Sequence, residues 1–220
     1  MAISIGRRVA VSLVTAWLVV ACNSVASAPP TSSPVPAATP PPGWKEVAWA
    51  DPDTFLSLPT EWTSTSPRET VLYDAASIEP AQRRVMDWSN VMAASGATRL
   101  VAYATDATGN ECCSIQVYVQ SGDGSLAAFV ERWIKETHDL LGPSIAIDQR
   151  AAHLTVGDAA RLAYAYALGR EAELAEIDVL YRTTDGRSVA ISVEGQYETG
   201  DVAALGPFAD RIVSTVRPSP

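Results

Sequence analysis

The sequence predicts an α+β fold in which a single antiparallel β-sheet is flanked by helices, after a signal peptide and a proline-rich tether. Three observations support this prediction. Short segments with apolar residues at every second position indicate strands. Three longer segments with apolar residues at every third or fourth position indicate helices. The order is strands, helix, two strands, helix, several antiparallel strands and a last helix, which most simply gives one sheet with helices packed on it.

The N-terminus has the features of a bacterial lipoprotein leader. Residues 1–8 contain two arginines and no acid, and residues 9–21 form an apolar segment too short to cross about 30 Å of hydrocarbon. The sequence "VVAC" at 19–22 resembles a lipobox, which predicts cleavage before Cys22 and attachment of acyl chains such as palmitate to its sulfur. We therefore expect residues 1–21 to be a signal peptide. The mature protein would then be lipid-anchored on the extracytoplasmic face of the cell membrane.

Two alternatives compete with this interpretation. The sequence "ASA" at 26–28 fits an ordinary signal-peptidase site, but Pro29 follows it directly and blocks that enzyme. A free thiol at Cys22 in an uncleaved anchor is the other alternative. The paired arginines resemble a twin-arginine signal, although the flanking pattern is poor, so general secretion is favoured.

A tether follows the leader. Residues 22–43 comprise the lipidated cysteine and a linker that contains seven prolines and no charge. Such a composition cannot build a core and indicates a semi-extended spacer. At about 3.1 Å per residue it reaches roughly 60 Å from the bilayer. The folded domain is expected over 44–218.

The charge of the chain excludes one class of partner. The formal net charge is −9, and loss of Arg7 and Arg8 with the signal peptide changes it to −11 (−9 − 2). An acidic surface without a basic cluster repels phosphate backbones, so we do not expect a nucleic-acid partner. The expected partners are the membrane through the lipid anchor, and an unknown protein, envelope component or small ligand. A monomer without a cofactor is expected.

The first half of the domain is predicted as strands around one helix. Strands are expected at 44–50, 54–59, 98–105 and 112–120. A helix is expected over 79–95, where Pro80 fits the first turn and Val85, Trp88 and Met92 recur at helical spacing.

The second half begins with the clearest helix, at 126–141. Ser125 is the expected N-cap, and the pair Gly142-Pro143 ends the helix. Strands are predicted at 144–149, 151–156, 160–168, 177–181 and 189–193. A final helix is expected over 207–216, with apolar residues at every fourth position.

The last strand pair allows its register to be argued. A two-residue loop would pair Val179 with Ser192 and place the apolar residues of the two strands on opposite faces. A three-residue loop, Thr184-Asp185-Gly186, pairs Val179 with Ile191 and places them on one face. The sequence therefore predicts the three-residue loop, with the glycine in the left-handed conformation.

Several segments resemble the PsbP-like fold, an α/β/α sandwich. They are "FLSLPTEW", "GDAARLAYAYAL", "VLYRTTDGRSVAISVEG" and "FADRIVSTVR". This fold is shared by the photosystem II extrinsic subunit, a Ran-binding import factor, and bacterial lipoproteins of the LpqN and DcrB types. The resemblance covers about residues 46–217 and implies a non-catalytic binding or accessory module, and the family offers no shared catalytic residues to transfer.

Two adjacent cysteines stand at the start of a predicted strand. If Cys22 is lipidated, Cys112 and Cys113 are the remaining cysteines, in a compartment that favours disulfides. Adjacent Cα atoms lie only about 3.8 Å apart, so a bridge between them would strain the backbone and could not lie in a regular strand. A strained vicinal disulfide, two packed thiols, and a redox or ligand-binding pair remain the alternatives.

An acidic run, "EAELAEID", is the main candidate for a cation. It contains Glu171, Glu173, Glu176 and Asp178. Glu176 and Asp178 fall opposite the apolar set of their strand, which predicts a solvated face. The alternative is a calcium site, because calcium prefers oxygen ligands such as carboxylates. The segment 106–111 is a second candidate for such a site. The spacing matches no known calcium loop, and no metal site is predicted.

The tryptophans suggest a contact surface. Trp88 and Trp133 fit the inner faces of their helices and are expected in the core. Trp44, Trp49 and Trp62 gather near the tether, where an exposed ring could contact a sugar, a peptide or a partner protein.

Two function classes remain. No nucleophile elbow, phosphate-binding loop or dinucleotide motif is present, and the two histidines are far apart in sequence. The favoured class is a lipid-anchored, extracytoplasmic binding or accessory protein that is not an enzyme. The alternative is a hydrolase-like envelope enzyme whose site assembles from dispersed residues. A cleft with convergent histidines or carboxylates would favour the enzyme. A shallow apolar patch near the three N-terminal tryptophans would favour binding.

Overall fold

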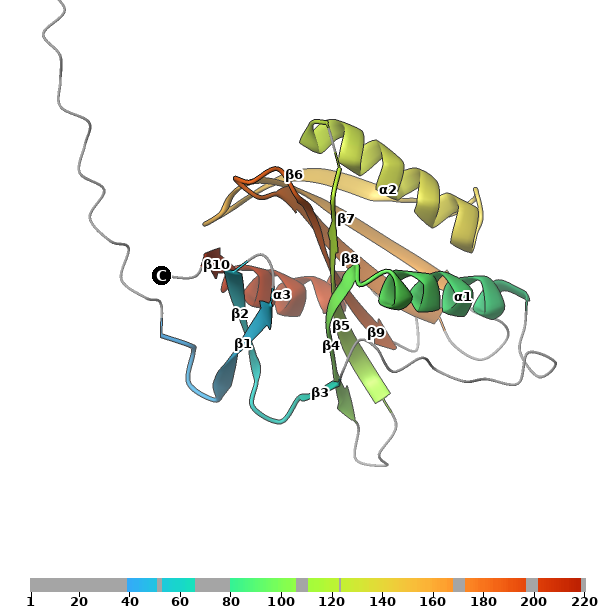
Figure 1. The fold of residues 1–220 in the computed structure, drawn as a ribbon. Helices are drawn as coiled ribbons and strands as arrows, with labels where there is room; N and C mark the ends of the chain where they lie inside the picture. Colours follow the sequence, from blue (N-terminus) through green and yellow to red (C-terminus); the bar gives the residue numbers. More distant parts are fainter. Residues whose placement is uncertain are drawn as a thin grey trace, which may run out of the picture. The chain divides into compact units, whose positions relative to one another are not determined.

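The part of the chain that the structure describes contains three helices and ten strands (Figure 1). The computed structural model describes residues 39–50, 53–65, 80–105, 111–122, 124–167, 173–196 and 202–218. All of these elements belong to the unit Ala37–Pro220. The leader, Cys22 and most of the tether lie outside the described residues.

The helices are α1 (Pro80–Ala94), α2 (Leu126–Leu141) and α3 (Val202–Val213). The strands are β1 (Trp44–Ala50), β2 (Asp53–Pro59), β3 (Thr63–Thr65), β4 (Thr98–Thr105), β5 (Glu111–Gln120), β6 (Asp148–Leu154), β7 (Gly157–Ala167), β8 (Glu173–Arg182), β9 (Ser188–Gln196) and β10 (Arg217–Pro218). No helix among the described residues is long and apolar enough to cross a membrane.

Seven strands form the main sheet, in the order β3-β4-β5-β9-β8-β7-β6, and all of its neighbours are antiparallel. The predicted α+β fold class, a large antiparallel sheet with helices, is confirmed. The first two strands do not join this sheet. They form a separate sheet in which β2 pairs with both β1 and β10. Leu56 and Leu58 of β2 are buried in the core beside α3.

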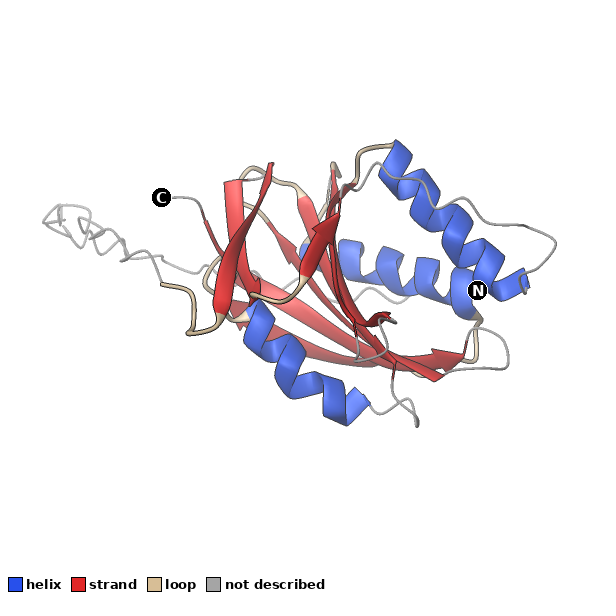
Figure 2. Ribbon diagram, turned by 90° about the horizontal axis from the view of Figure 1, so that it is seen from below, coloured by secondary structure: helices blue, strands red, loops and turns tan. Residues whose placement is uncertain are grey.

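The main sheet is covered on both faces. Figure 2 shows α3 on one side of the sheet and α1 and α2 on the other. On β5, β7, β8 and β9, the odd-numbered residues of the core pack toward α3, and the even-numbered ones pack toward α1 and α2. This parity follows from the strand period of two.

The α3 side is a mainly apolar core. Ile177 and Ile191 of the sheet and Leu205 and Ile212 of α3 are completely buried. Each such side chain stabilises the fold by about 1.5–3 kcal/mol relative to an exposed one. This layer therefore contributes strongly to stability.

The ends of α2 follow the predicted signals. The Ser125 side chain accepts a hydrogen bond from the amide of Ala128 at 3.2 Å, as an N-cap does. At the other end, Gly142 has a φ of 121°, and its amide donates to the carbonyl of His138 at 2.9 Å. The predicted start and end of this helix are confirmed.

The β8–β9 hairpin has the predicted register. Val179 lies opposite Ile191. The amide of Thr183 donates to the carbonyl of Arg187 at 2.9 Å, which closes a three-residue loop, and Gly186 has a φ of 87°. The glycine is needed because this left-handed conformation is costly for residues with a Cβ atom.

Two element predictions were wrong. The segments 144–149 and 151–156 were expected as two strands, but only β6 forms, since the chain turns first and the amide of Ile145 donates to the carbonyl of Gly142 at 3.3 Å. The last helix begins at Val202, so Pro207 lies inside it rather than in its first turn. Pro207 cannot donate a helical hydrogen bond, and Leu205, two residues before it, is completely buried.

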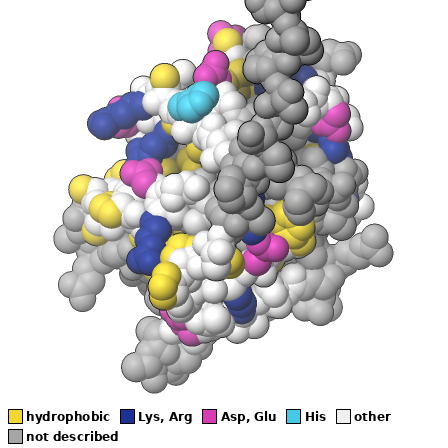
Figure 3. All heavy atoms as spheres, turned by 90° about the vertical axis from the view of Figure 1, so that its left-hand side faces the viewer, with side chains coloured by type: hydrophobic (Ala, Val, Ile, Leu, Met, Phe, Trp, Pro, Cys, Tyr) yellow, Lys and Arg dark blue, Asp and Glu magenta, His cyan; other side chains and the backbone are white. Residues whose placement is uncertain are grey.

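The surface is mixed in charge. Figure 3 shows lysine and arginine side chains interspersed with acidic and hydrophobic ones on the described part of one face. Several charged side chains of the described residues are paired, such as Lys135 with Asp139 at 2.5 Å and Arg150 with Asp148 at 2.8 Å. Exposed pairs of this kind contribute little to stability.

Candidate functional site

A cavity of about 190 Å³ lies between α1, α2 and the even-numbered face of the main sheet. Its lining comes from six elements. The residues are Val85, Met86, Trp88 and Ser89 of α1, Gln116 and Tyr118 of β5, Trp133, Glu136, Thr137, Leu140 and Leu141 of α2, Tyr164 and Tyr166 of β7, Glu176 of β8, and Glu194 of β9. The cavity therefore exists only in the folded domain.

Asp178 lies in the sheet below this cavity and is completely buried. Its carboxylate accepts three hydrogen bonds, from the indole N–H of Trp133 at 2.8 Å, the hydroxyl of Tyr164 at 2.8 Å and the hydroxyl of Ser192 at 2.5 Å. Burial raises the pKa of Asp178, and these donors act in the opposite direction. Asp178 thus positions the residues around it.

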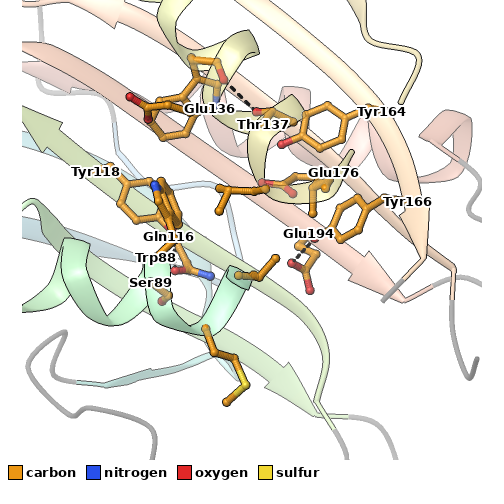
Figure 4. Close-up of a pocket in the computed structure, with 15 residues that line it drawn as sticks. Trp88, Ser89, Gln116, Tyr118, Glu136, Thr137, Tyr164, Tyr166, Glu176 and Glu194 are labelled. Atoms are coloured by element: carbon orange, nitrogen blue, oxygen red, sulfur yellow. Dashed lines mark hydrogen bonds between the residues drawn. The ribbon is translucent and has the colours of Figure 1, made fainter. Parts of the chain in front are cut away.

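Two further carboxyls face the cavity itself. Glu176 and Glu194 lie directly opposite each other on β8 and β9, and the hydroxyl of Tyr166 donates to Glu194 at 2.9 Å. In Figure 4, Glu176 lies between Tyr118 on one side of the view and Tyr166 on the other. Burial, followed by the charges of Asp178 and Glu194, raises the pKa of Glu176 well above its ordinary value.

Aromatic rings surround these carboxyls. The centroids of Trp88 and Tyr118 are 5.2 Å apart, those of Tyr118 and Trp133 are 5.7 Å apart, and those of Tyr164 and Tyr166 are 6.0 Å apart. Burial, followed by nearby acids, raises the pKa of Tyr118, Tyr164 and Tyr166 well above the ordinary value. Their hydroxyls therefore stay protonated and act as hydrogen-bond donors at neutral pH.

The rim lies between the two helices. Glu136 of α2 is one-third exposed and lies 4.0 Å from Arg132, and burial raises its pKa. The Nε of Arg84 on α1 donates to the carbonyl of Leu140 on α2 at 3.1 Å, which ties the helices together. Val85, Leu140 and Leu141 give this rim an apolar surface.

The residue types that line the cavity determine which ligands it can bind. None of the fifteen lining residues, all in the described part of the chain, is lysine, arginine or histidine. Among the described residues, no group of three or more histidine, cysteine, aspartate or glutamate side chains is arranged to hold a metal ion. The site can accept hydrogen bonds from a ligand or bind a positively charged group of the ligand. It can also donate a proton from a carboxyl with a raised pKa.

The prediction of a solvated acidic face was wrong. Asp178 is completely buried and Glu176 is mostly buried, because α1 and α2 cover the side of β8 that faces away from the apolar core. Glu173 is exposed. Glu171 and the segment 106–110 lie outside the described residues.

The three N-terminal tryptophans lie away from the cavity. Trp62 is buried, with its ring centroid 5.5 Å from that of Phe208. Trp44 is partly buried, and the guanidinium of Arg211 lies 4.6 Å from the centre of its ring. The side chain of Trp49 lies outside the described residues. Trp62 is therefore not an exposed contact ring. A partner contact through Trp44 or Trp49 stays a prediction.

The cysteine pair lies at an irregularity of β5. Cys113 pairs with Ala104 and with Gly195, whereas Thr105 pairs with Glu111, so the register skips Cys112. Cys113 packs partly buried against the apolar core, and the side chain of Cys112 is outside the described residues. The state of the two sulfurs stays a prediction.

Sequence reasoning missed the cavity, although part of its signal was present. The predicted pairing of Val179 with Ile191 already places Glu176 opposite Glu194. Like charges opposite each other destabilise a sheet, so this pairing marked an unusual position. The alternation of Tyr164 and Tyr166 places these residues on the same face.

Comparisons with known proteins identify the fold. No family model matches the chain, and no curated protein sequence matches it either. The solution structure of cyanobacterial PsbP (CyanoP) from Synechocystis superposes with a TM-score of 0.50 and 11% sequence identity, covering 86% of this chain and 99% of that one. The fold is PsbP-like.

Two further solved structures are less similar. LpqN, involved in cell envelope biogenesis of Mycobacterium tuberculosis, has 14% identity and a TM-score of 0.46, over 80% of this chain and 91% of its own. The Ran-binding protein Mog1p of Saccharomyces cerevisiae has 12% identity and a TM-score of 0.48, over 80% of this chain and 95% of its own. The PsbP-like fold predicted from the sequence is confirmed, and function must be argued from the site.

Proposed function

We propose that this protein is a lipid-anchored, extracytoplasmic binding protein whose ligand enters the cavity between α1, α2 and the main sheet. The observation that carries this proposal is the cavity itself, which Glu176 and Glu194 line together with aromatic side chains. Binding sites typically combine apolar walls with a few convergent polar groups.

The anchor is supported by the leader and the tether. The "VVAC" sequence precedes a linker rich in proline, which suits a domain attached near a membrane but held away from it. In a bacterial host, Cys22→Ala should prevent lipidation and change both the size of the mature protein and its membrane fractionation. Cys113→Ala is the matched control and should leave both unchanged. Unaltered size and fractionation of the Cys22→Ala protein would contradict the anchor.

Ligand entry can be tested by filling the cavity. Ser89 lines it, whereas Val91 on the same helix is 64% exposed. Native mass spectrometry of the full mature protein, isolated from its membranes, should detect a small molecule that the Ser89→Phe variant lacks and the Val91→Phe variant retains. The same bound mass on all three proteins, or none on any of them, would contradict binding in this cavity.

A specific observation favours a second candidate, a hydrolase-like enzyme. Glu176 has a raised pKa beside a second carboxyl, which resembles the acid and base pair of enzymes that cleave glycosidic bonds. Binding is preferred because Asp178 and Glu194 are held by hydrogen bonds from aromatic side chains that also form the walls. Turnover of aryl glycosides or aryl esters that Glu176→Gln abolishes would support the enzyme instead.

A further inference from the structure

The cavity concentrates negative charge. Glu176, Asp178 and Glu194 occupy neighbouring positions on two paired strands of the same sheet face. The charged groups that raise the pKa of Glu176 are Asp178 and Glu194, both acidic, and the described lining contains no basic residue. A buried carboxylate is costly unless a positive charge compensates for it or a proton neutralises it.

The three carboxyls are not equivalent. Asp178 already accepts hydrogen bonds from Trp133, Tyr164 and Ser192, and it does not line the cavity. Glu176 and Glu194 do line it. A positively charged ligand would therefore meet Glu176 and Glu194, while Asp178 holds the surrounding side chains in place.

The walls suit a positive charge. Trp88, Tyr118, Trp133, Tyr164 and Tyr166 all line the cavity. The face of an aromatic ring attracts a cation, and this attraction is strongest where water is excluded. Ca²⁺ fits poorly, because it takes six to eight oxygen ligands and the aromatic faces that form much of the wall supply none.

The volume limits the size of the ligand. At about 190 Å³ the cavity is smaller than the roughly 300–1,000 Å³ of pockets for drug-sized molecules. It is somewhat larger than the engineered cavity of about 150 Å³ that binds benzene. The occupant is therefore a compact group, and the apolar rim formed by Val85, Leu140 and Leu141 suits a short alkyl chain.

We propose that the cavity binds a small organic ammonium ion, which Glu176 and Glu194 neutralise and which the aromatic rings enclose. This inference rests on the proposed function, namely that the cavity takes up a ligand. A neutral sugar is the competing ligand for such walls, but it carries no positive charge that would favour the ionised forms of Glu176 and Glu194.

Isothermal titration calorimetry with the full mature protein tests the charge directly. The probes are choline and butylammonium, each compared with an uncharged analogue of similar shape, 3,3-dimethylbutan-1-ol and pentan-1-ol. At least one cation should bind at least about tenfold more tightly than its uncharged analogue at neutral pH. Equal binding of cations and analogues, tighter binding of glucose, or no binding of either cation would overturn the ammonium proposal.

Two matched variants distinguish a specific role of Glu176 from the general effect of removing one negative charge. Glu176→Gln should abolish the preference for the cation. Glu173→Gln makes the same change at an exposed position of the same strand and should leave the preference intact. If Glu176→Gln fails to fold by circular dichroism, Trp88→Leu on α1 is the second variant and should weaken cation binding about tenfold. Retention of the preference in the variant that folds would contradict the site.

Failure of this inference can be told apart from failure of the proposed function. If no ammonium preference is found while a copurifying molecule is lost from Ser89→Phe alone, the cavity binds a ligand of another class. If no molecule depends on Ser89 and no probe binds, both proposals are wrong.

Discussion

Trp133 on α2 donates its indole N–H to the carboxylate of Asp178 on β8 at 2.8 Å, in a completely buried contact between residues 45 positions apart. This bond joins a helix to a central strand of the sheet. It also explains how a carboxylate can occupy a position without solvent, since a buried acceptor is tolerated where donors satisfy it.

The Trp133–Asp178 bond should contribute measurably to stability. Trp133→Phe keeps an aromatic ring but leaves the Asp178 oxygen without one of its donors, so the free energy of unfolding should fall by about 1–3 kcal/mol. Urea denaturation followed by fluorescence measures this change. Trp88→Phe is the control, because it alters the same aromatic cluster and leaves all three donors to Asp178 in place. A loss no greater for Trp133→Phe than for Trp88→Phe would contradict the role of the bond.

Stability should fall as pH rises through the acidic and neutral range. Burial raises the pKa of Glu176 and Asp178 in the folded state above their ordinary values of 4.5 and 3.8. Between the unfolded and folded pKa values the native protein binds more protons than the unfolded chain, so the free energy of unfolding decreases with pH in that window. Thermal denaturation between pH 4.5 and 8 measures the slope.

Glu176→Gln should flatten this slope and stabilise the protein at neutral pH, with a rise in Tm of about 2–4 °C for each 1 kcal/mol gained. The other titratable groups that face Glu176 are Tyr118, Glu136, Tyr164, Tyr166, Asp178 and Glu194. Asp185 in the hairpin loop does not interfere, because Arg187 lowers its pKa to about 2 and it titrates below this window. An unchanged slope in Glu176→Gln would show that Glu176 does not titrate in the window.

The hairpin loop depends on the conformation of one residue. Gly186 has a φ of 87°, so Gly186→Ala should cost about 1–2 kcal/mol by placing a Cβ atom in the left-handed region. Thermal or chemical denaturation checks the loss. Gly186→Asn should be milder, because asparagine adopts this conformation more readily. Equal destabilisation by alanine and asparagine would indicate that contacts of the added side chain, rather than φ, are responsible.

Local signals in the sequence were sufficient for much of the fold. Ser125 and Gly142 mark the ends of α2 because capping depends on a few neighbouring atoms. Loop length determines the β8–β9 register for the same reason. Pro207 misled the prediction of α3, since the burial of Leu205 is a long-range effect that the local pattern does not contain.

The cavity could not be predicted from local patterns in the sequence. Alternation along β8 shows that Glu176 and Asp178 share a face, but it does not show whether another element covers that face. Covering it depends on where α1 and α2 pack, which is decided by contacts between residues distant in sequence. The separate pairing of β1 and β2 with β10 has the same origin, because β10 is the last strand of the chain.

The segregation of odd and even residues on the central strands also bears on how the chain reaches its native state. A slip of β8 by one position against β9 would place Glu176 and Asp178 in the apolar core beneath α3 and would move Ile177 out of that core. Such misaligned intermediates would carry unsolvated acids and be short-lived. The residues proposed to hold a ligand therefore also discourage incorrect strand pairing during folding.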